Sequence, residues 1–163
     1  MESTMKRGGF TFRTAAVFFV LSAFVDVIFI DSRIPLLGNI YGGVVAVTYH
    51  LIYAVLFLML GVGLWNAKPW GYTALLVTTL VYTVDAVQAF FSRGAVEADL
   101  IKQLSEHEEI FRQAGVDKEY FLNVFTNNFH NMMTVVPFLV LACWWGFVWY
   151  AYIRRDYFQA VKK

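Results

Sequence analysis

The sequence predicts an all-α membrane protein, an antiparallel four-helix transmembrane bundle with an amphipathic helical segment between its third and fourth membrane-spanning helices. Hydrophobic residues make up 59% of the 163 residues and the mean hydropathy is +0.56, whereas soluble domains are roughly 45–50% apolar. Four apolar stretches are each long enough to cross a bilayer as a helix. Aromatic residues flank these stretches, as they do at the headgroup level of membranes.

The four stretches cover residues 11–30, 43–65, 70–91 and 132–153. A helix needs about 20 residues to cross the hydrocarbon core, and each stretch meets that length. The first stretch could instead be a cleaved signal peptide, because Lys6 and Arg7 precede it. Its length, the presence of Asp26 and the lack of an A-x-A-like site favour a retained helix. We therefore expect residues 1–163 to form a single integral membrane domain.

The basic residues around the stretches predict the orientation, because Lys and Arg gather on the cytoplasmic side. Eight basic residues lie before or at the start of the first stretch, between the second and third, and after the fourth. The other five lie in the opposite connections, most of them in a long segment where the rule is weaker. We therefore expect both termini in the cytoplasm, and a tight cytoplasmic turn at residues 66–69, where Pro69 starts the third helix.

Residues 92–129 form the one sizeable extramembrane segment that the sequence predicts. We expect a helix over residues 95–114, stopped by Gly115, and then Asp117 as the N-cap of a helix that runs into the fourth stretch. The simpler interpretation is an amphipathic helix lying across the mouth of the bundle or on the outer interface. A lid, or a docking surface for a partner, is the alternative.

A small set of polar residues interrupts the apolar stretches, where ionisable groups are costly and usually face the bundle interior. Asp26, His50 and Asp85 each lie about five to seven residues from the outer end of their stretch, which places them about 7–11 Å below the outer boundary. His130 lies at or just above that boundary, and Gln88 follows Asp85 by one turn. Helices of opposite direction thus bring rare polar residues into one layer.

Helical spacing predicts that these residues face other helices. Gly42, Ala46, His50 and Ala54 recur every four residues, which gives a stripe of small residues typical of close helix packing. Similar spacing relates Asp85 to small and polar residues of the third stretch. By contrast, we interpret the three tryptophans of the fourth stretch as lipid-facing or interfacial: Trp144, Trp145 and Trp149.

Three roles are open for the polar layer. It could be structural, with interhelical hydrogen bonds that fix the register of the bundle. It could bind or conduct a small ligand, a cation or a proton, with Asp26, His50, Asp85, Gln88 and His130 as ligand-binding candidates. It could also be catalytic, by acid–base chemistry or with a metal held by Asp26, His50, Asp85 and His130. No HExxH, Glu-x-x-His or HxxxH motif pairs two metal ligands on one helix, so the metal and the cofactor are not predicted.

Composition narrows the function classes further. The net charge of +1 and the scattered Lys and Arg residues give no reason to expect nucleic acid. The one cysteine, Cys143, can form no disulfide within the chain. The sequence thus predicts a non-enzymatic membrane protein, either an accessory subunit or a small-ligand binder with an Asp/His pocket in the outer third. A small membrane enzyme is the alternative. The expected partners are the lipid bilayer and either other membrane subunits or further copies of the chain.

Overall fold

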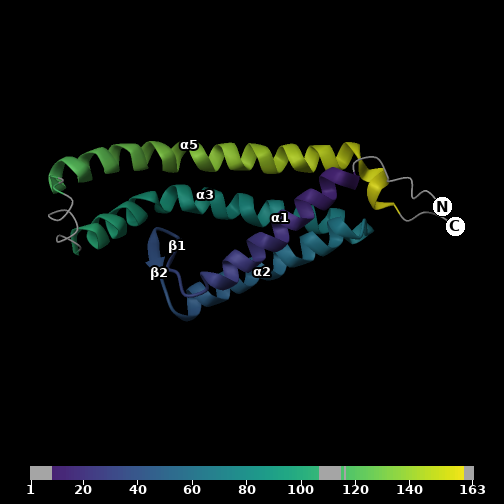
Figure 1. Cartoon of the computed structure of the whole chain (residues 1–163), viewed down its shortest axis with the longest axis horizontal. Helices are drawn as coiled ribbons and strands as arrows, with labels where there is room; N and C mark the ends of the chain where they lie inside the picture. Colours follow the sequence, from purple (N-terminus) through teal and green to yellow (C-terminus); the bar gives the residue numbers. More distant parts are fainter. Residues whose placement is uncertain (1–8, 107–114, 116, 160–163) are drawn as a thin grey trace.

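The computed structural model describes residues 9–106, 115 and 117–159, and these are mostly helical (Figure 1). The long helices are α1 (Gly9–Ile28), α2 (Val44–Trp65), α3 (Pro69–Glu106) and α5 (Lys118–Ile153). The shorter elements are the strands β1 (Ile34–Leu36) and β2 (Asn39–Tyr41) and the 3-10 helix η1 (Arg155–Phe158). Within the described residues, four helices are long and apolar enough to cross a membrane. Each of them overlaps one of the four apolar stretches that the sequence predicts, and α3 and α5 extend well beyond theirs.

Helices that are consecutive in the chain pack side by side, α1 on α2, α2 on α3 and α3 on α5. The start of α1 and the 3-10 helix η1 lie at the same end of the molecule, called here the terminal end (Figure 1). The strands β1 and β2 join α1 to α2 at the opposite end of these two helices, called here the hairpin end. From the terminal end, α1 and α2 diverge from α5 along the length of the molecule (Figure 1).

Helix α3 is longer than expected and does not break at the end of the third apolar stretch. It continues without interruption for 38 residues to Glu106, so a separate helix beginning at residue 95 and lying across the bundle is wrong. Gly94 is accommodated inside the helix, and no proline is present to interrupt it. The expected helix end at residue 114 lies outside the described residues. At 1.5 Å per residue α3 is about 57 Å long, well beyond the roughly 30 Å of a hydrocarbon core.

Helix α5 begins at the predicted cap. The Asp117 carboxylate accepts a hydrogen bond from the backbone N–H of Tyr120, which satisfies a donor that the first helical turn leaves free. The helix then runs for 36 residues past Pro137 to Ile153. Arg93 of α3 donates from Nη1 to Thr134 Oγ1 at 3.3 Å, which places these two residues at one level along the paired helices.

The turn between α2 and α3 is as tight as the sequence predicts. Asn66 caps α2, Ala67 adopts a positive φ of 52°, and the Lys68 N–H returns to the carbonyl of Gly63 at 3.1 Å. Next to this turn the backbones of α2 and α3 touch, because a Cβ atom placed on Gly71 would lie 2.6 Å from the Gly63 carbonyl. The two glycines therefore set the closest approach of the helices.

An aromatic cluster closes the terminal end of the bundle. Phe12 of α1 is fully buried, and its ring stacks on Tyr157 of η1 with centroids 4.5 Å apart. Tyr157 also donates its hydroxyl to the carbonyl of Leu64 at 2.8 Å, which ties η1 to the end of α2. Rings of α1, α5 and η1 complete this cluster, called here the aromatic plug: Phe12, Phe147, Tyr150, Tyr157 and Phe158.

The β-hairpin between α1 and α2 was not predicted from the sequence. Its strands pair antiparallel with Leu36 opposite Asn39, which leaves Leu37 and Gly38 as a two-residue loop. Both loop residues have positive φ, 50° and 82°, as the hairpin turns that match the twist of the strands require. Ile34 is buried while Leu37 is exposed, so one face of the hairpin packs on the bundle.

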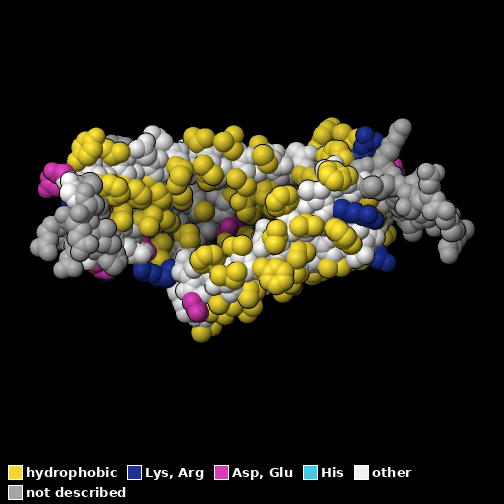
Figure 2. Space-filling view, viewed as in Figure 1, with side chains coloured by type: hydrophobic (Ala, Val, Ile, Leu, Met, Phe, Trp, Pro, Cys, Tyr) yellow, Lys and Arg dark blue, Asp and Glu magenta, His cyan; other side chains and the backbone are white. Residues whose placement is uncertain are grey.

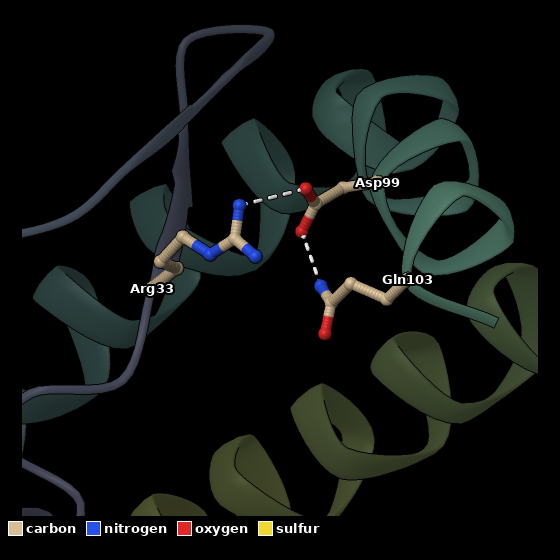
Figure 3. Close-up of polar contacts among 3 residues, drawn as sticks. All are labelled: Arg33, Asp99 and Gln103. Carbon is tan, nitrogen blue, oxygen red and sulfur yellow. Dashed lines mark hydrogen bonds and ion pairs between the residues drawn. The ribbon is translucent and has the colours of Figure 1, made fainter. Parts of the chain in front are cut away.

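Polar contacts anchor the hairpin segment to α3 (Figure 3). Arg33 forms an ion pair with Asp99, with Nη1 and Oδ1 2.9 Å apart. The other carboxylate oxygen of Asp99 accepts from Gln103 Nε2 at 2.7 Å. Nearer the loop, the backbone N–H of Gly38 donates to Ser92 Oγ at 2.8 Å. The hairpin is thus held along about two turns of α3.

Candidate functional site

The first polar contact of the site joins α1 and α2. Asp26 Oδ1 lies 3.1 Å from His50 Nδ1, and both side chains are largely buried, at 19% and 12% exposed. Ala46 and Ala54 flank His50 at four residues on either side and are themselves buried. The predicted small-residue stripe is therefore confirmed over Ala46, His50 and Ala54, whereas Gly42 precedes α2 and lies outside the helix. The stripe lets α1 and α2 approach closely enough for the pair to form.

The Asp26 contact determines how His50 can act. A carboxylate accepts hydrogen bonds, so it selects the tautomer in which Nδ1 carries the proton. The lone pair of the neutral ring then lies on Nε2. That nitrogen is buried and has no hydrogen-bond partner among the described residues. A buried polar atom without a partner is uncommon and marks a position where a further group would be stabilising.

The second set of contacts joins α2, α3 and the hairpin around Asp85. Tyr49 donates its hydroxyl to Asp85 Oδ2 at 2.8 Å, and Gln88 Nε2 lies 3.2 Å from Oδ1. Gln88 also donates to the carbonyl of Pro35 at 2.9 Å and accepts from the N–H of Leu37 at 3.0 Å. The Asp85 carboxylate is thereby oriented by two donors, Tyr49 and Gln88. Gln88 also anchors the hairpin to α3.

These contacts form one continuous group at the hairpin end, called here the polar band: Asp26, Tyr49, His50, Asp85 and Gln88. Tyr49 and His50 are neighbours on α2, and their rings meet edge to face with centroids 5.6 Å apart. The two carboxylates have different direct partners, because Asp26 contacts His50 and Asp85 accepts from Tyr49. Four of the five predicted site residues thus lie in the band.

His130 is the predicted site residue that the structure leaves apart. Its side chain is exposed on α5, and its backbone carbonyl accepts from Thr134 Oγ1. The separation follows from the divergence of α5 from α1 and α2 toward the hairpin end (Figure 1). In the part of the chain that the structure describes, no three His, Cys, Asp or Glu residues gather as metal ligands. The four metal candidates are therefore not brought together.

A cavity of about 440 Å³ lies between α1, α2, α3 and α5. Figure 2 shows that the hydrophobic face is hollowed between α5 and the α1–α2 pair, and acidic side-chain atoms are visible in that hollow. No acidic residue is among the described residues that line the cavity itself. The cavity, called here the aromatic cavity, is lined by Ala15, Phe18, Phe19, Ser22, Phe57, Tyr82, Cys143, Trp144 and Phe147.

Aromatic rings from all four helices meet around Trp144 at this cavity. The Trp144 ring packs against Phe19 with centroids 5.2 Å apart and stacks on Tyr82 at 5.3 Å. Phe57 stacks on Trp144 from the α2 side at 6.3 Å. Phe147 lines the cavity and also contacts Phe12 of the aromatic plug, so the plug forms the wall toward the terminal end. The interpretation of Trp144 as lipid-facing bulk is wrong.

The aromatic cavity and the polar band are consecutive along the helices. Ser22 lines the cavity and precedes Asp26 by four residues, which puts both on one face of α1 about one turn apart. Tyr82 lines the cavity and precedes Asp85 by three residues, which puts both on one face of α3 about one turn apart. On α2 the rings of Tyr49, Tyr53 and Phe57 follow one another in contact. The carboxylates therefore lie about one helical turn from the cavity.

Sequence reasoning missed the roles of Tyr49, Phe57, Tyr82 and Trp144 because it considered mainly the carboxylates, histidines and amides within the apolar stretches. The i, i+4, i+8 spacing of three aromatic residues beside His50 was the available signal on α2. Comparison with known protein families, with curated proteins and with solved structures gave no match. The function is therefore inferred from the aromatic cavity and the polar band alone.

Proposed function

We propose that this chain is an integral membrane protein that binds a small ligand without converting it. In this proposal the four helices form an antiparallel transmembrane bundle with both termini in the cytoplasm. The ligand occupies the aromatic cavity and contacts the polar band in the outer third of the bundle.

The surface supports insertion into a bilayer. Large hydrophobic side chains are exposed along all four helices, and they cover most of the face in Figure 2. Exposed hydrophobic surface of this extent is stable in lipid and would promote aggregation in water. The described basic residues at the terminal end support a cytoplasmic location for it: Arg13, Lys68, Arg154 and Arg155.

The position of Arg93 supports the depth of the polar band. This guanidinium donates to Thr134 and lies over the ring of Phe90 at 4.4 Å, an arrangement suited to the headgroup level. Asp85 lies eight residues earlier on α3, about 12 Å deeper at 1.5 Å per residue. A band at that depth belongs to the outer leaflet.

The observation that carries the proposal is a cavity that adjoins buried polar groups and is closed on one side. The volume of about 440 Å³ is within the roughly 300–1,000 Å³ of small-molecule sites. A mainly apolar lining with a few convergent polar groups is the usual composition of such sites. The aromatic plug at the terminal end argues against a continuous pore. A purely structural network would have no need of the cavity.

A small membrane enzyme is the second candidate, and the Asp26–His50 pair favours it. A histidine oriented through Nδ1 by a carboxylate presents Nε2 as a base, which is the arrangement of many acid–base sites. Measuring the metal content of the purified protein tests one version of this alternative. Stoichiometric Zn, Fe or Mn would favour the enzyme. Co-purifying membrane subunits would favour an accessory role for the binding protein.

The test of ligand binding is to fill the aromatic cavity. Ser22→Phe places a ring at the cavity wall, whereas Val84→Phe introduces the same ring at a position of α3 that is 70% exposed. We expect solvent extracts of purified wild-type protein and of Val84→Phe to contain the same amphiphile at near-stoichiometric amount by mass spectrometry. Extracts of Ser22→Phe should lack it. Equal contents in all three preparations, or no retained compound in any, would contradict the proposal.

A further inference from the structure

We propose that the ligand of the aromatic cavity is a lipophilic organic cation, such as a quaternary ammonium compound with an apolar substituent. This inference rests on the proposed function and specifies the chemistry of the same site. It follows from the charge of the polar band, the rings of the cavity and the positions of the nearest basic residues.

The charge balance of the site is negative. Asp26 and Asp85 are the carboxylates within α1 and the membrane-crossing part of α3. Between residues 14 and 92 the sequence holds two basic residues, Arg33 and Lys68, and both lie in connections between helices. A carboxylate in a low-dielectric bundle is costly unless a positive charge approaches it. His50 can offset one of the two charges when it is protonated.

The basic residues nearest the polar band are engaged elsewhere. Arg33 forms its ion pair with Asp99, beyond the band toward the far end of α3 (Figure 3). Arg93 donates to Thr134 of α5 and packs over Phe90. Asp85 is instead held by the neutral donors Tyr49 and Gln88. The negative charge of Asp85 is therefore oriented by these contacts and not neutralised by them.

The aromatic rings supply the second element of cation recognition. A cation is attracted to the face of an aromatic ring, most strongly to tryptophan. Trp144, Tyr82, Phe19 and Phe57 come from four different helices and meet at one cavity. Among the described residues that line it, none is Lys or Arg. Rings that line an open cavity with carboxylates one turn away suit a cation and disfavour an anion.

The same lining favours a free cation over the headgroup of a choline phospholipid. Such a headgroup carries a phosphate next to its ammonium group, and phosphates bind to Lys, Arg or exposed backbone N–H groups. In the described structure the cavity offers none of these basic side chains, and its wall consists of helices whose N–H groups are already bonded. We therefore assign the site to an organic cation without an attached phosphate.

Cys143 provides a native reporter for the test. It is the single cysteine of the chain, it lines the aromatic cavity and it is exposed. The experiment uses the full chain in nanodiscs of phosphatidylglycerol and measures the rate of Cys143 alkylation by N-ethylmaleimide. The probes are phenyltrimethylammonium and tert-butylbenzene, which share one shape and differ by one charge. The two probes partition differently into lipid. For each probe, the half-effective concentration is therefore compared between wild type and variants in the same nanodiscs, where partitioning is equal.

We expect phenyltrimethylammonium to slow alkylation of the wild-type protein, and the half-effective concentration to rise about tenfold in Asp85→Asn. Asp85→Glu, which keeps the charge, should retain most of the protection. Trp144→Leu should weaken protection by about two- to tenfold, the range for loss of one cation–ring contact. The half-effective concentration of tert-butylbenzene should be the same in wild type and Asp85→Asn. Thermal unfolding of each variant in the nanodiscs confirms that it is folded.

The other outcomes separate the two proposals. Protection by both probes with no effect of Asp85→Asn would retain a ligand cavity and overturn the cationic ligand. Loss of protection in nanodiscs of phosphatidylcholine, at equal free probe, would identify a choline headgroup as the occupant and also overturn it. Absence of protection by either probe in folded protein would overturn both the cationic ligand and the proposed function.

Discussion

The imidazole of His50 lies 3.1 Å from the carboxylate of Asp26, nitrogen Nδ1 to oxygen Oδ1, and so joins α2 to α1 inside the bundle. Each of these side chains is mostly buried, so neither can be replaced without leaving the other poorly solvated. On the other side of the same helix turn, Tyr49 holds Asp85 of α3. One turn of α2 therefore forms polar contacts with both neighbouring helices, α1 and α3.

The Asp26–His50 contact predicts non-additive effects of substitution. In detergent near neutral pH, Asp26→Asn and His50→Gln should each lower the free energy of unfolding, and the double variant should lose less than the sum. The expected coupling is about 0.5–3 kcal/mol, the range for residues in contact. Asp26→Asn with Tyr157→Phe serves as the control, because Tyr157 lies at the terminal end of the bundle and donates to the Leu64 carbonyl. A coupling for this control as large as that of the contact pair would contradict the geometry.

Bulk on the small-residue stripe of α2 should destabilise the bundle. Ala54 is 3% exposed and lies on the stripe that carries His50. Ala54→Phe would force α2 away from its neighbours, with an expected loss of about 1–3 kcal/mol. Leu58→Phe, at a position 42% exposed, is the matched control and should be near neutral. The measurement is thermal unfolding in detergent, and equal stability of the two variants would mean that Ala54 faces lipid.

The contact between Gly63 and Gly71 predicts a large effect of a single methyl group. A Cβ atom on Gly71 would lie 2.6 Å from backbone atoms of Gly63, and a backbone cannot yield as a flexible side chain can. Gly71→Ala should therefore destabilise the protein by about 1–3 kcal/mol. On α5, a Cβ atom at Gly146 meets nothing within 4 Å in the described structure. Gly146→Ala should be neutral or stabilising by up to about 1 kcal/mol, because alanine favours the helix.

Tyr157 predicts a dependence of stability on alkaline pH. Burial raises the pKa of its hydroxyl above the usual value, an effect that nearby Arg13 partly opposes. A raised folded-state pKa gives stability that is complete below the unfolded pKa of about 10 and is lost as pH rises through the folded pKa. Tyr157→Phe should cost about 0.5–1.5 kcal/mol near pH 8, since the hydrogen bond to Leu64 is lost.

The difference between wild type and Tyr157→Phe should then shrink as the pH rises above about 10. The measurement is unfolding in detergent at a series of pH values, with both proteins compared at each pH. Because the remaining tyrosines titrate in both proteins, the difference isolates Tyr157. A constant difference across this range would mean that the hydroxyl does not titrate with folding.

The proposed orientation predicts labelling from opposite faces of the membrane. Cysteines introduced at Ser105 and at Lys163, each in a Cys143→Ala background, should react with an impermeant maleimide from opposite sides. In intact cells the Ser105 position should be labelled and the Lys163 position should react after the cells are opened. Labelling of both positions in intact cells would overturn the orientation and the outer-leaflet depth of the polar band.

The helical framework was predictable because the signals are local. Twenty-residue apolar stretches, the Asp117 cap and the Pro69 start each act within a few residues, and all three are present where expected. The hairpin was not predicted because its loop lacks the usual sequence signal, an Asn-Gly or Asp-Gly pair. The loop instead places Leu37 at positive φ, a conformation that leucine seldom adopts.

The site was predictable in part, because the sequence gives the depth and facing of single residues but not their partners. Asp26, His50 and Asp85 do lie together at the hairpin end, as their equal depths indicated. Which carboxylate meets His50 depends on the rotation and crossing of α1, α2 and α3, and these follow from contacts such as Gly63 with Gly71. His130, which was expected at or just above the outer boundary, does not join them, since α5 diverges from α1 and α2 toward the hairpin end (Figure 1).

The stacking of Phe12 on Tyr157 has a consequence for the order in which the protein can fold. Tyr157 follows Phe12 by 145 residues in the sequence, so all four long helices are made before η1. Until η1 emerges, α1 can pair with α2 and α2 with α3, but the terminal end of the nascent bundle stays open. Closure of this end is therefore a contact of high sequence separation that forms after the helices have been made, and it completes the wall of the cavity.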